Sequence, residues 1–240
     1  TDTIAINMVT QVVNGDGSIS VGAGYAGAAG SRLGISVSSA GDVNGDGYDD
    51  VIVGANQENF ASGAAYVIYG SASGAGVSLS SGSIASDKGF KIVGPNTGNS
   101  TGWDVSGVGD INGDGYADVL VSGFTNGSNS YVVYGRESNN TINLSALSAS
   151  DGFKISGRGS VGWAVSGLGD INGDGLADFG IAGDGINMFV VYGQSNNSDV
   201  NLTDNTIAAG VGFEIDQVNT ISSAGDVNGC LLYTSDAADE

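Results

Sequence analysis

The chain has no histidine, a single cysteine and a single proline, and only 6 basic residues against 26 acidic ones. Without histidine, neither a histidine-dependent catalytic triad nor a histidine-ligated metal site can form within this sequence. Because Cys230 has no second cysteine to pair with, an intramolecular disulfide is excluded. The net charge of −20 attracts cations and repels polyanions, so we expect no nucleic-acid partner.

Long apolar runs are also missing. No segment approaches the ~20 consecutive apolar residues of a membrane helix, so we expect no direct membrane insertion. Residues 1–20 show neither the basic start nor the apolar centre of a signal peptide. Glycine is abundant instead, with 43 residues and no Gly-X-Y period, while 40% of all residues are apolar. This composition argues against disorder and indicates many short strands joined by tight turns.

A ten-residue motif recurs along the chain. It reads GDVNGDGYDD at 41–50, GDINGDGYAD at 109–118 and GDINGDGLAD at 169–178, and a fourth copy begins as GDVNG at 225–229. The first aspartates of successive copies are 68, 60 and 56 residues apart, and the flanking segments recur in the same order. The chain is therefore built from repeating units of variable loop length.

Each unit contains four segments with strand patterns. The segment before the motif alternates apolar and polar residues, and the segment after it is a short apolar run such as 51–53. A third segment is β-branched and aromatic, as at 131–134, and a fourth alternates again, as at Phe153 and Ile155. Helical periodicity is absent.

Such a unit cannot bury both faces of its central strands alone and needs neighbours on either side. The pattern therefore predicts an all-β fold of β-propeller blades, each with four antiparallel strands. In this arrangement Trp103 and Trp163, at the start of their units, are expected to pack between blades rather than to contact a ligand.

The repeated motif has the pattern Asp-x-Asn-x-Asp-Gly-x-x-Asp, with an oxygen-bearing side chain at every second position. Calcium prefers six to eight oxygen ligands, and glycine at position 6 permits the sharp turn of a calcium loop. Position 7 would donate its backbone carbonyl, which leaves its side chain free to vary, and position 9 would close the cage. The predicted metal ligands are Asp42, Asn44, Asp46, Tyr48 and Asp50; Asp110, Asn112, Asp114, Tyr116 and Asp118; and Asp170, Asn172, Asp174, Leu176 and Asp178.

Other interpretations of the motif fit less well. Asn-Gly and Asp-Gly turns between strands would explain a single copy, but three copies retain every oxygen ligand while other residues vary. Magnesium keeps more of its water, and zinc prefers nitrogen and sulfur ligands. EF-hand and dockerin loops need an acidic residue at position 12, which here is Val53, Val121 and Ile181. Thrombospondin-type calcium repeats recur at much shorter intervals.

The segment LGISVSSAGDVNGDGYDDVIVGAN at 33–56 resembles an FG-GAP repeat, the blade motif of the integrin α-subunit propeller and its bacterial relatives. Leu33-Gly34 corresponds to the "FG" and 54–56 to the "GAP", which drifts to 122–124 and 182–184 in the later units. The resemblance implies a propeller of about seven blades. It also implies structural calcium in the loops, ligand binding on the opposite face and a secreted or cell-surface protein.

The resemblance divides the chain into parts. We expect FG-GAP blades with calcium loops at 30–97, 98–157 and 158–217, an incomplete set of three full blades. Residues 1–29 would be the end of a preceding blade or a linker, and 218–229 the start of a truncated fourth blade. In that blade Asp226 and Asn228 would be the first ligands of a further, truncated calcium site.

The last eleven residues, CLLYTSDAADE at 230–240, break the motif where Asp, Gly and a closing Asp are due. They resemble a translated sequencing adapter, and we expect them to be an artefact of library preparation. The remaining blades of the same parent chain would then be partners of the blades present here.

These observations favour a non-enzymatic, calcium-stabilised extracellular module for adhesion or for binding a protein or carbohydrate ligand. One alternative is the propeller part of a secreted enzyme that degrades glycans or lipids, and another is a structural spacer in a large surface protein. For the enzyme, carboxylates outside the loops would have to pair as acid and base, whereas the simpler expectation is that they are solvated turn residues. These carboxylates are Asp87, Asp104, Asp151 and Asp184.

Overall fold

The computed structural model describes residues 30–72, 77, 79, 82–125, 129–157, 161–183, 187–202, 206–216 and 220–222, and the backbone of two N-terminal strands. Those two strands, β1 (Gln11–Val13) and β2 (Ile19–Val21), pair antiparallel. The expectations for the rest of 1–29, for Asp226 and Asn228 of the fourth motif, and for the tail at 230–240 lie outside the described residues.

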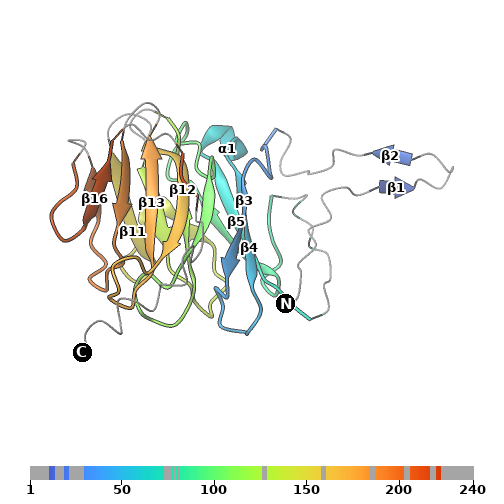
Figure 1. The fold of residues 1–240 in the computed structure, drawn as a ribbon. Coiled ribbons are helices and arrows are strands. Elements are labelled where there is room, and N and C mark those ends of the chain that lie inside the picture. Colours follow the sequence, from blue (N-terminus) through green and yellow to red (C-terminus); the bar gives the residue numbers. More distant parts are fainter. Residues whose placement is uncertain are drawn as a thin grey trace.

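Three twisted sheets stand side by side, each built around the four antiparallel strands of one repeating unit (Figure 1). The first blade contains β3 (Val37–Gly41), β4 (Asp50–Ala55), β5 (Ala64–Ile68) and β6 (Gly89–Val93). The second contains β7 (Val105–Gly109), β8 (Asp118–Val121), β9 (Asn129–Val133) and β11 (Gly152–Gly157). The third contains β12 (Val161–Gly169), β13 (Asp178–Gly183), β14 (Met188–Val191) and β16 (Gly212–Ile215). Neighbouring strands within each blade are antiparallel, which confirms the predicted all-β blades of an incomplete propeller.

Two blades gain a fifth strand that the four-strand prediction did not include. β10 (Ile142–Asn143) belongs to the second unit but pairs in parallel with β6 of the first blade. β15 (Val200–Leu202) of the third unit pairs in the same way with β11 of the second blade. An outermost strand presents unpaired backbone groups, and the short added strand covers them. Backbone pairing thereby joins each of these two blades to the unit that follows it in the chain.

Two short helical turns interrupt the strands. α1 (Glu58–Ala61) links β4 to β5, and its residues Asn59, Phe60 and Ala61 all have positive φ, so the turn is left-handed. η1 (Leu144–Ala146) follows β10, where the Asn143 side chain accepts a hydrogen bond from the Ser145 backbone N–H. Neither turn has the length for a 3.6-residue pattern, which is why no helix was predicted.

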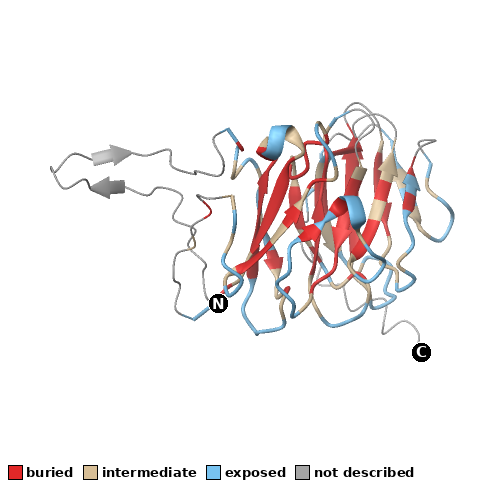
Figure 2. Ribbon diagram, turned by 180° about the vertical axis from the view of Figure 1, so that it is seen from behind, coloured by how far each residue is buried: buried red, intermediate tan, exposed pale blue. Residues whose placement is uncertain are grey.

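The hydrophobic core lies between the blades, where Figure 2 shows buried residues concentrated in the strands. Ile52, Val67 and Phe90 of the first blade share one cluster with Val105 and Val133 of the second. A second cluster joins the second blade to the third. Each blade thus buries its apolar side chains against its neighbour, as expected for strands that are covered on both faces.

The outer faces of this three-blade stack are more exposed. Phe90 and Phe153 on the fourth strands of the first two blades are each 1% exposed, whereas Phe213 at the same position of the third blade is 40% exposed. On the opposite side, Val37 is 41% exposed, whereas its counterpart Val105 is 3% exposed. The difference follows from position in the stack, because only the inner faces have a described neighbour.

Candidate metal centres

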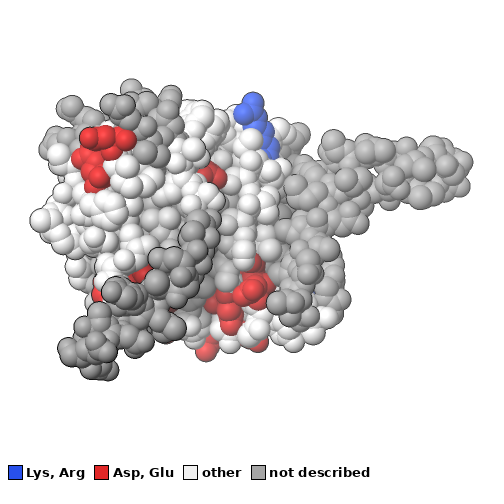
Figure 3. Space-filling model, viewed as in Figure 1, with Lys and Arg blue, Asp and Glu red and all other residues white. Residues whose placement is uncertain are grey.

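The three repeated loops lie at one edge of the stack, each between the first and second strands of its blade. The first loop (42–50) joins β3 to β4, the second (110–118) joins β7 to β8, and the third (170–178) joins β12 to β13. Figure 3 shows acidic side chains gathered at the lower edge, below β3 and β4. Because the blades are equivalent, the loops form a row along this edge.

Within the first loop, the carboxylate of Asp42 accepts three backbone hydrogen bonds. Gly45 N–H and Asp46 N–H donate to Oδ1 over 2.7 and 3.0 Å, and Gly47 N–H donates to Oδ2 over 2.8 Å. Gly45 and Gly47 have φ of 76° and 88°, a left-handed conformation that glycine adopts without a Cβ penalty. The backbone therefore wraps around the carboxylate at position 1.

Positions 3 and 5 close the same turn. Asn44 Nδ2 donates to Asp46 Oδ2 over 2.9 Å, and Asn44 Oδ1 accepts from the Asp46 backbone N–H over 3.0 Å. The Tyr48 N–H donates to Asp46 Oδ1. The second and third loops repeat all of these contacts on Asp110, Asn112, Asp114, Asp170, Asn172 and Asp174. Three of the predicted ligand side chains are thus brought together in each loop.

The carboxylate at position 9 lies beneath the loop and is fully buried in all three copies. In the first loop, Asp50 Oδ2 accepts from Val43 N–H over 3.0 Å, and Oδ1 accepts from Gly70 N–H over 2.8 Å. Burial raises the pKa of Asp50 to about 6 and that of Asp118 to about 7, against the opposing effect of the backbone hydrogen bonds. Burial also raises the pKa of Asp178. Position 9 therefore ties each loop to the end of its third strand.

The donor chemistry at positions 1, 3 and 5 fits a hard cation, because it consists of carboxylate and amide oxygens alone. These carboxylate oxygens keep acceptor capacity beyond their present hydrogen bonds. In the described parts of the chain, however, no three carboxylates converge closely enough to form a metal cage by themselves. The participation of positions 7 and 9, and calcium binding itself, remain predictions.

Position 7 has a role that the sequence analysis did not foresee. Its side chain was expected to be free to vary, but in the second and third loops it packs on the preceding loop. A Cβ built on Gly45 would lie 2.7 Å from Cε1 of Tyr116, and one built on Gly113 would lie 3.0 Å from Cδ2 of Leu176. In the first two loops the missing Cβ at position 4 leaves room for these side chains, and in all three loops position 4 has the positive φ that glycine adopts readily.

Backbone hydrogen bonds reinforce the contact between successive loops. The Ala117 N–H donates to the Asp42 carbonyl over 3.0 Å, and the Arg136 N–H donates to the Val43 carbonyl over 2.7 Å. The third blade repeats both bonds, from the N–H groups of Ala177 and Gln194 to the carbonyls of Asp110 and Ile111. The sequence contains no direct signal for these bonds, since their partners are more than 60 residues apart.

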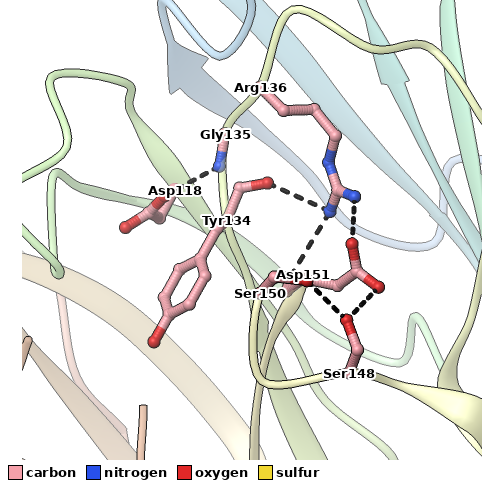
Figure 4. A network of polar contacts seen from close by, with 7 residues as sticks. All are labelled: Asp118, Tyr134, Gly135, Arg136, Ser148, Ser150 and Asp151. Carbon is pink, nitrogen blue, oxygen red and sulfur yellow. Dashed lines mark hydrogen bonds and ion pairs between the residues drawn. The ribbon is translucent and has the colours of Figure 1, made fainter. Parts of the chain in front are cut away.

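An ion pair between Arg136 and Asp151 lies next to the segment that anchors Asp118 of the second loop (Figure 4). Arg136 Nη1 lies 2.6 Å from Asp151 Oδ1, while the Ser148 hydroxyl donates to Asp151 Oδ2 over 2.6 Å. The Arg136 guanidinium also lies 5.8 Å from the ring centre of Phe90 in the first blade. Next to this network, Gly135 N–H donates to Asp118 Oδ1, so the ion pair and the loop share one backbone segment.

The other carboxylates considered as acid and base have separate places. Asp104 bridges three blades, because its Oδ1 accepts from the Ser36 hydroxyl over 2.7 Å and its Oδ2 accepts from Val165 N–H over 2.8 Å. Asp151 is paired with Arg136, and Asp87 is exposed beside Lys88. The expectation of solvated turn carboxylates is therefore wrong for Asp104 and Asp151, which are structural. Asp184 lies outside the described residues.

The opposite edge of the stack carries an aromatic cluster, formed by Trp103, Phe124 and Trp163. Trp103 stacks on Phe124 with 4.1 Å between ring centres, and it lies 5.6 Å from Trp163 of the third blade. Phe124 meets Trp163 edge-on at 4.8 Å. The predicted packing of both tryptophans between blades is confirmed, although Trp163 remains 38% exposed.

Comparison with known proteins agrees with this architecture. A family model described as "FG-GAP repeat" matches residues 33–68, and one described as "FG-GAP-like repeat" matches residues 110–181. The chain is 37% identical to integrin alpha-2 of Bos taurus over 93 residues, which are 39% of this chain and 8% of that protein. It is 33% identical to integrin alpha-4 of Xenopus laevis over 97 residues, which are 40% of this chain and 9% of that protein.

Stacked four-stranded blades with an aspartate loop at the same edge define an incomplete β-propeller. The chain contains FG-GAP repeats and resembles the integrin α subunits, as predicted. Its matched part spans less than a tenth of the length of either relative. None of the helices described here has the length and apolarity to cross a membrane.

Proposed function

We propose that the chain is part of a calcium-stabilised, non-enzymatic, extracellular β-propeller module for adhesion or ligand binding. The observation that carries the proposal is the threefold recurrence of one loop geometry, in which Asp, Asn and Asp side chains turn toward each other around a glycine-rich backbone. The resemblance to integrin α subunits supports the adhesion role and the extracellular location.

The cation would act on stability rather than on chemistry. Each loop concentrates carboxylates at positions 1, 5 and 9, and their mutual repulsion opposes the tight turn. A bound calcium ion supplies the positive charge that offsets this repulsion. Because each loop also contacts the next blade, stabilising the loop would stabilise the stack. Extracellular calcium modules bind with Kd of ~10⁻⁴–10⁻³ M, which suits a structural ion in a calcium-rich exterior.

The ligand surface that we favour is the exposed part of the aromatic cluster on the opposite edge, which departs from the sequence expectation that its tryptophans serve blade packing alone. Its rings combine large apolar area with fixed geometry, which is typical of residues that dominate binding energy at interfaces. Trp163 presents 38% of its surface to solvent. A protein or carbohydrate partner would engage this edge, while the calcium loops hold the blades in register at the other edge.

The structural contacts of Asp104 and Asp151 support the non-enzymatic part of the proposal, because both carboxylates were candidates for acid–base chemistry.

Thermal unfolding with and without calcium tests the proposal. At a free calcium concentration of 100 Kd, binding adds about 2.7 kcal/mol of stability for each occupied site. We expect EDTA to lower the Tm of the wild type by several degrees. The combined variant Asp46→Asn, Asp114→Asn, Asp174→Asn should lose this response, because it removes one charged ligand per loop.

The matched control is Asp87→Asn, which removes a carboxylate that is 74% exposed and lies outside the loops. It should respond to calcium as the wild type does. An identical Tm in EDTA and in calcium for the wild type would refute calcium stabilisation. A response that persists in the triple asparagine variant would show that calcium acts through general charge screening instead of through the loops.

A further inference from the structure

We propose that the side chain at position 7 of each loop positions the calcium ligands of the preceding loop, so that neighbouring sites are coupled. This inference rests on the proposed calcium binding and concerns Tyr116 and Leu176. Pattern reasoning assigns position 7 only a backbone carbonyl toward its own site. The packing described above gives its side chain a second role, toward the site of the neighbouring blade.

The contact falls on the part of the loop that holds the first ligand. Tyr116 lies against Gly45, and the N–H of Gly45 makes a 2.7 Å hydrogen bond to Asp42 Oδ1. The ring therefore fixes the peptide that orients the position 1 carboxylate of the first loop. One blade later, Leu176 lies against Gly113, whose N–H makes a 2.7 Å bond to Asp110 Oδ1.

The backbone on the other side of Asp42 is held by the same neighbour. Its carbonyl accepts from Ala117 N–H, the residue next to Tyr116, and the Ala117 methyl group abuts Gly41, where a Cβ would lie 2.8 Å away. The second loop thus contacts the first loop on both sides of its position 1 ligand, Asp42. A change in the second loop that moves Tyr116 or Ala117 must also move the first loop.

The third loop lacks such a neighbour within the described residues, and its exposure shows the consequence. Ile171 at position 2 is 41% exposed, whereas Val43 and Ile111 at the same position are fully buried under the next blade. In the described portion of the chain, no N–H group donates to the carbonyls of Asp170 and Ile171. The third loop has the same predicted ligands as the others, but no residue of a following blade that the structure describes holds it.

Coupling through these contacts has a defined thermodynamic form. If calcium in the second loop orders Tyr116 over Gly45, it raises the affinity of the first loop. By reciprocity, calcium in the first loop then raises the affinity of the second by the same factor. Coupling between sites in proteins typically changes affinity by about 5- to 150-fold. Occupancy would therefore spread from loop to loop along the edge of the stack.

Calcium titration by isothermal calorimetry on the full chain tests the proposal, with calcium chloride as the only ligand. Tyr116→Ala removes the contact with the first loop but keeps every predicted ligand, because position 7 contributes a backbone carbonyl. We expect unchanged stoichiometry, and because the coupling between the first and second loops is reciprocal, the later of their two binding steps should weaken by about tenfold, within the usual range of coupling. Leu176→Ala should have the same effect on the second and third loops.

Two variants separate positioning from a general packing defect. Phe60→Ala removes an aromatic side chain that is 91% exposed and lies outside the loops, and it should leave all affinities within about twofold of the wild type. Tyr116→Leu introduces the residue that serves at the third loop and should restore the affinity that Tyr116→Ala loses. Thermal unfolding in EDTA measures how much stability each variant loses in the absence of calcium.

Each outcome decides the matter. Weakened binding in Tyr116→Ala with rescue in Tyr116→Leu supports the coupling, and matching isotherms for Tyr116→Ala and Phe60→Ala overturn it while leaving calcium binding intact. A lower Tm in EDTA with an unchanged isotherm also overturns it, because the side chain would then serve stability only. If Tyr116→Ala does not fold, Leu176→Ala against Phe60→Ala gives the same comparison. A wild type that takes up no calcium refutes the proposed function itself.

Discussion

Phe153 and Phe213 occupy the same position on the fourth strands of neighbouring blades, yet they differ in burial. Phe153 is 1% exposed and its ring lies 6.3 Å from that of Phe179 in the third blade, whereas Phe213 is 40% exposed. We therefore predict that Phe153→Ala destabilises the protein much more than Phe213→Ala. The pair is a direct measure of what a neighbouring blade contributes, because the residue type, the strand and the substitution are the same.

The expected magnitudes follow from burial. Replacing a core phenylalanine by alanine costs about 3–5 kcal/mol, because the transfer free energy and the cavity both count. At Phe213 only about three fifths of the side chain leaves water, and solvent can fill the space, so the transfer term alone gives about 1–2 kcal/mol. The difference between the two variants should therefore be about 1–4 kcal/mol.

Urea unfolding followed by tryptophan fluorescence provides the assay, since Trp103 and Trp163 lie in the second and third blades. Both variants should keep the slope of the wild type in denaturant, so that the shift in midpoint reports stability. Equal losses for Phe153→Ala and Phe213→Ala would refute the reasoning, because the third blade would then be covered as completely as the second. A larger loss of stability for Phe213→Ala would mean that the fourth strand of the third blade is buried more deeply than that of the second.

Two further predictions concern carboxylates outside the loops. Asp104→Ala should cost about 2–4 kcal/mol in urea unfolding, because it removes hydrogen bonds to two neighbouring blades from a charged acceptor; a loss below about 0.5 kcal/mol, the size of an ordinary surface substitution, would show that this bridge is dispensable. Burial raises the pKa of Asp151, but the Ser148 hydroxyl and the Arg136 guanidinium lower it more, to below 3.8. The charged form therefore stabilises the fold above that pH, so the stability difference between the wild type and Asp151→Asn should be constant near neutral pH and shrink as the pH falls below 3.8. A difference that does not change with pH would contradict this assignment.

Much of the fold could be predicted from the sequence because its signals are local. The apolar and polar alternation at 153–155 and the apolar run at 119–121 each indicate, within a few residues, which faces of a strand are buried. In the structure Phe153, Ile155 and the whole of β8 are buried, in agreement with those patterns. The turn of each loop was equally readable, since glycine at positions 4 and 6 marks left-handed backbone.

The features that were missed depend on distant parts of the chain. β10 is only two residues long, and its partner strand β6 lies some fifty residues earlier, so no local period could reveal the pairing. Tyr116 looks like a variable turn residue until its ring is placed over Gly45. The same holds for Asp104, whose partners Ser36 and Val165 come from the blades on either side. Repetition identifies the units, but it does not show how one unit holds the next.

The structure also changes which positions of the motif are evidence of a metal site. Aspartate at position 9 recurs in all three copies, but Asp50 and its equivalents each accept two backbone hydrogen bonds while buried, which is reason enough for an aspartate there. Position 1 is similarly explained by the amides that surround it. Position 5 is different, because Asp46 is exposed and the two bonds that its carboxylate accepts, from Tyr48 N–H and Asn44 Nδ2, both come from the loop itself. Because the carboxylates at 46, 114 and 174 contact neither the next strand nor the next blade, the triple asparagine variant tests calcium binding with less disturbance of the fold than a change at position 1, which the loop amides surround, or at position 9, which is buried.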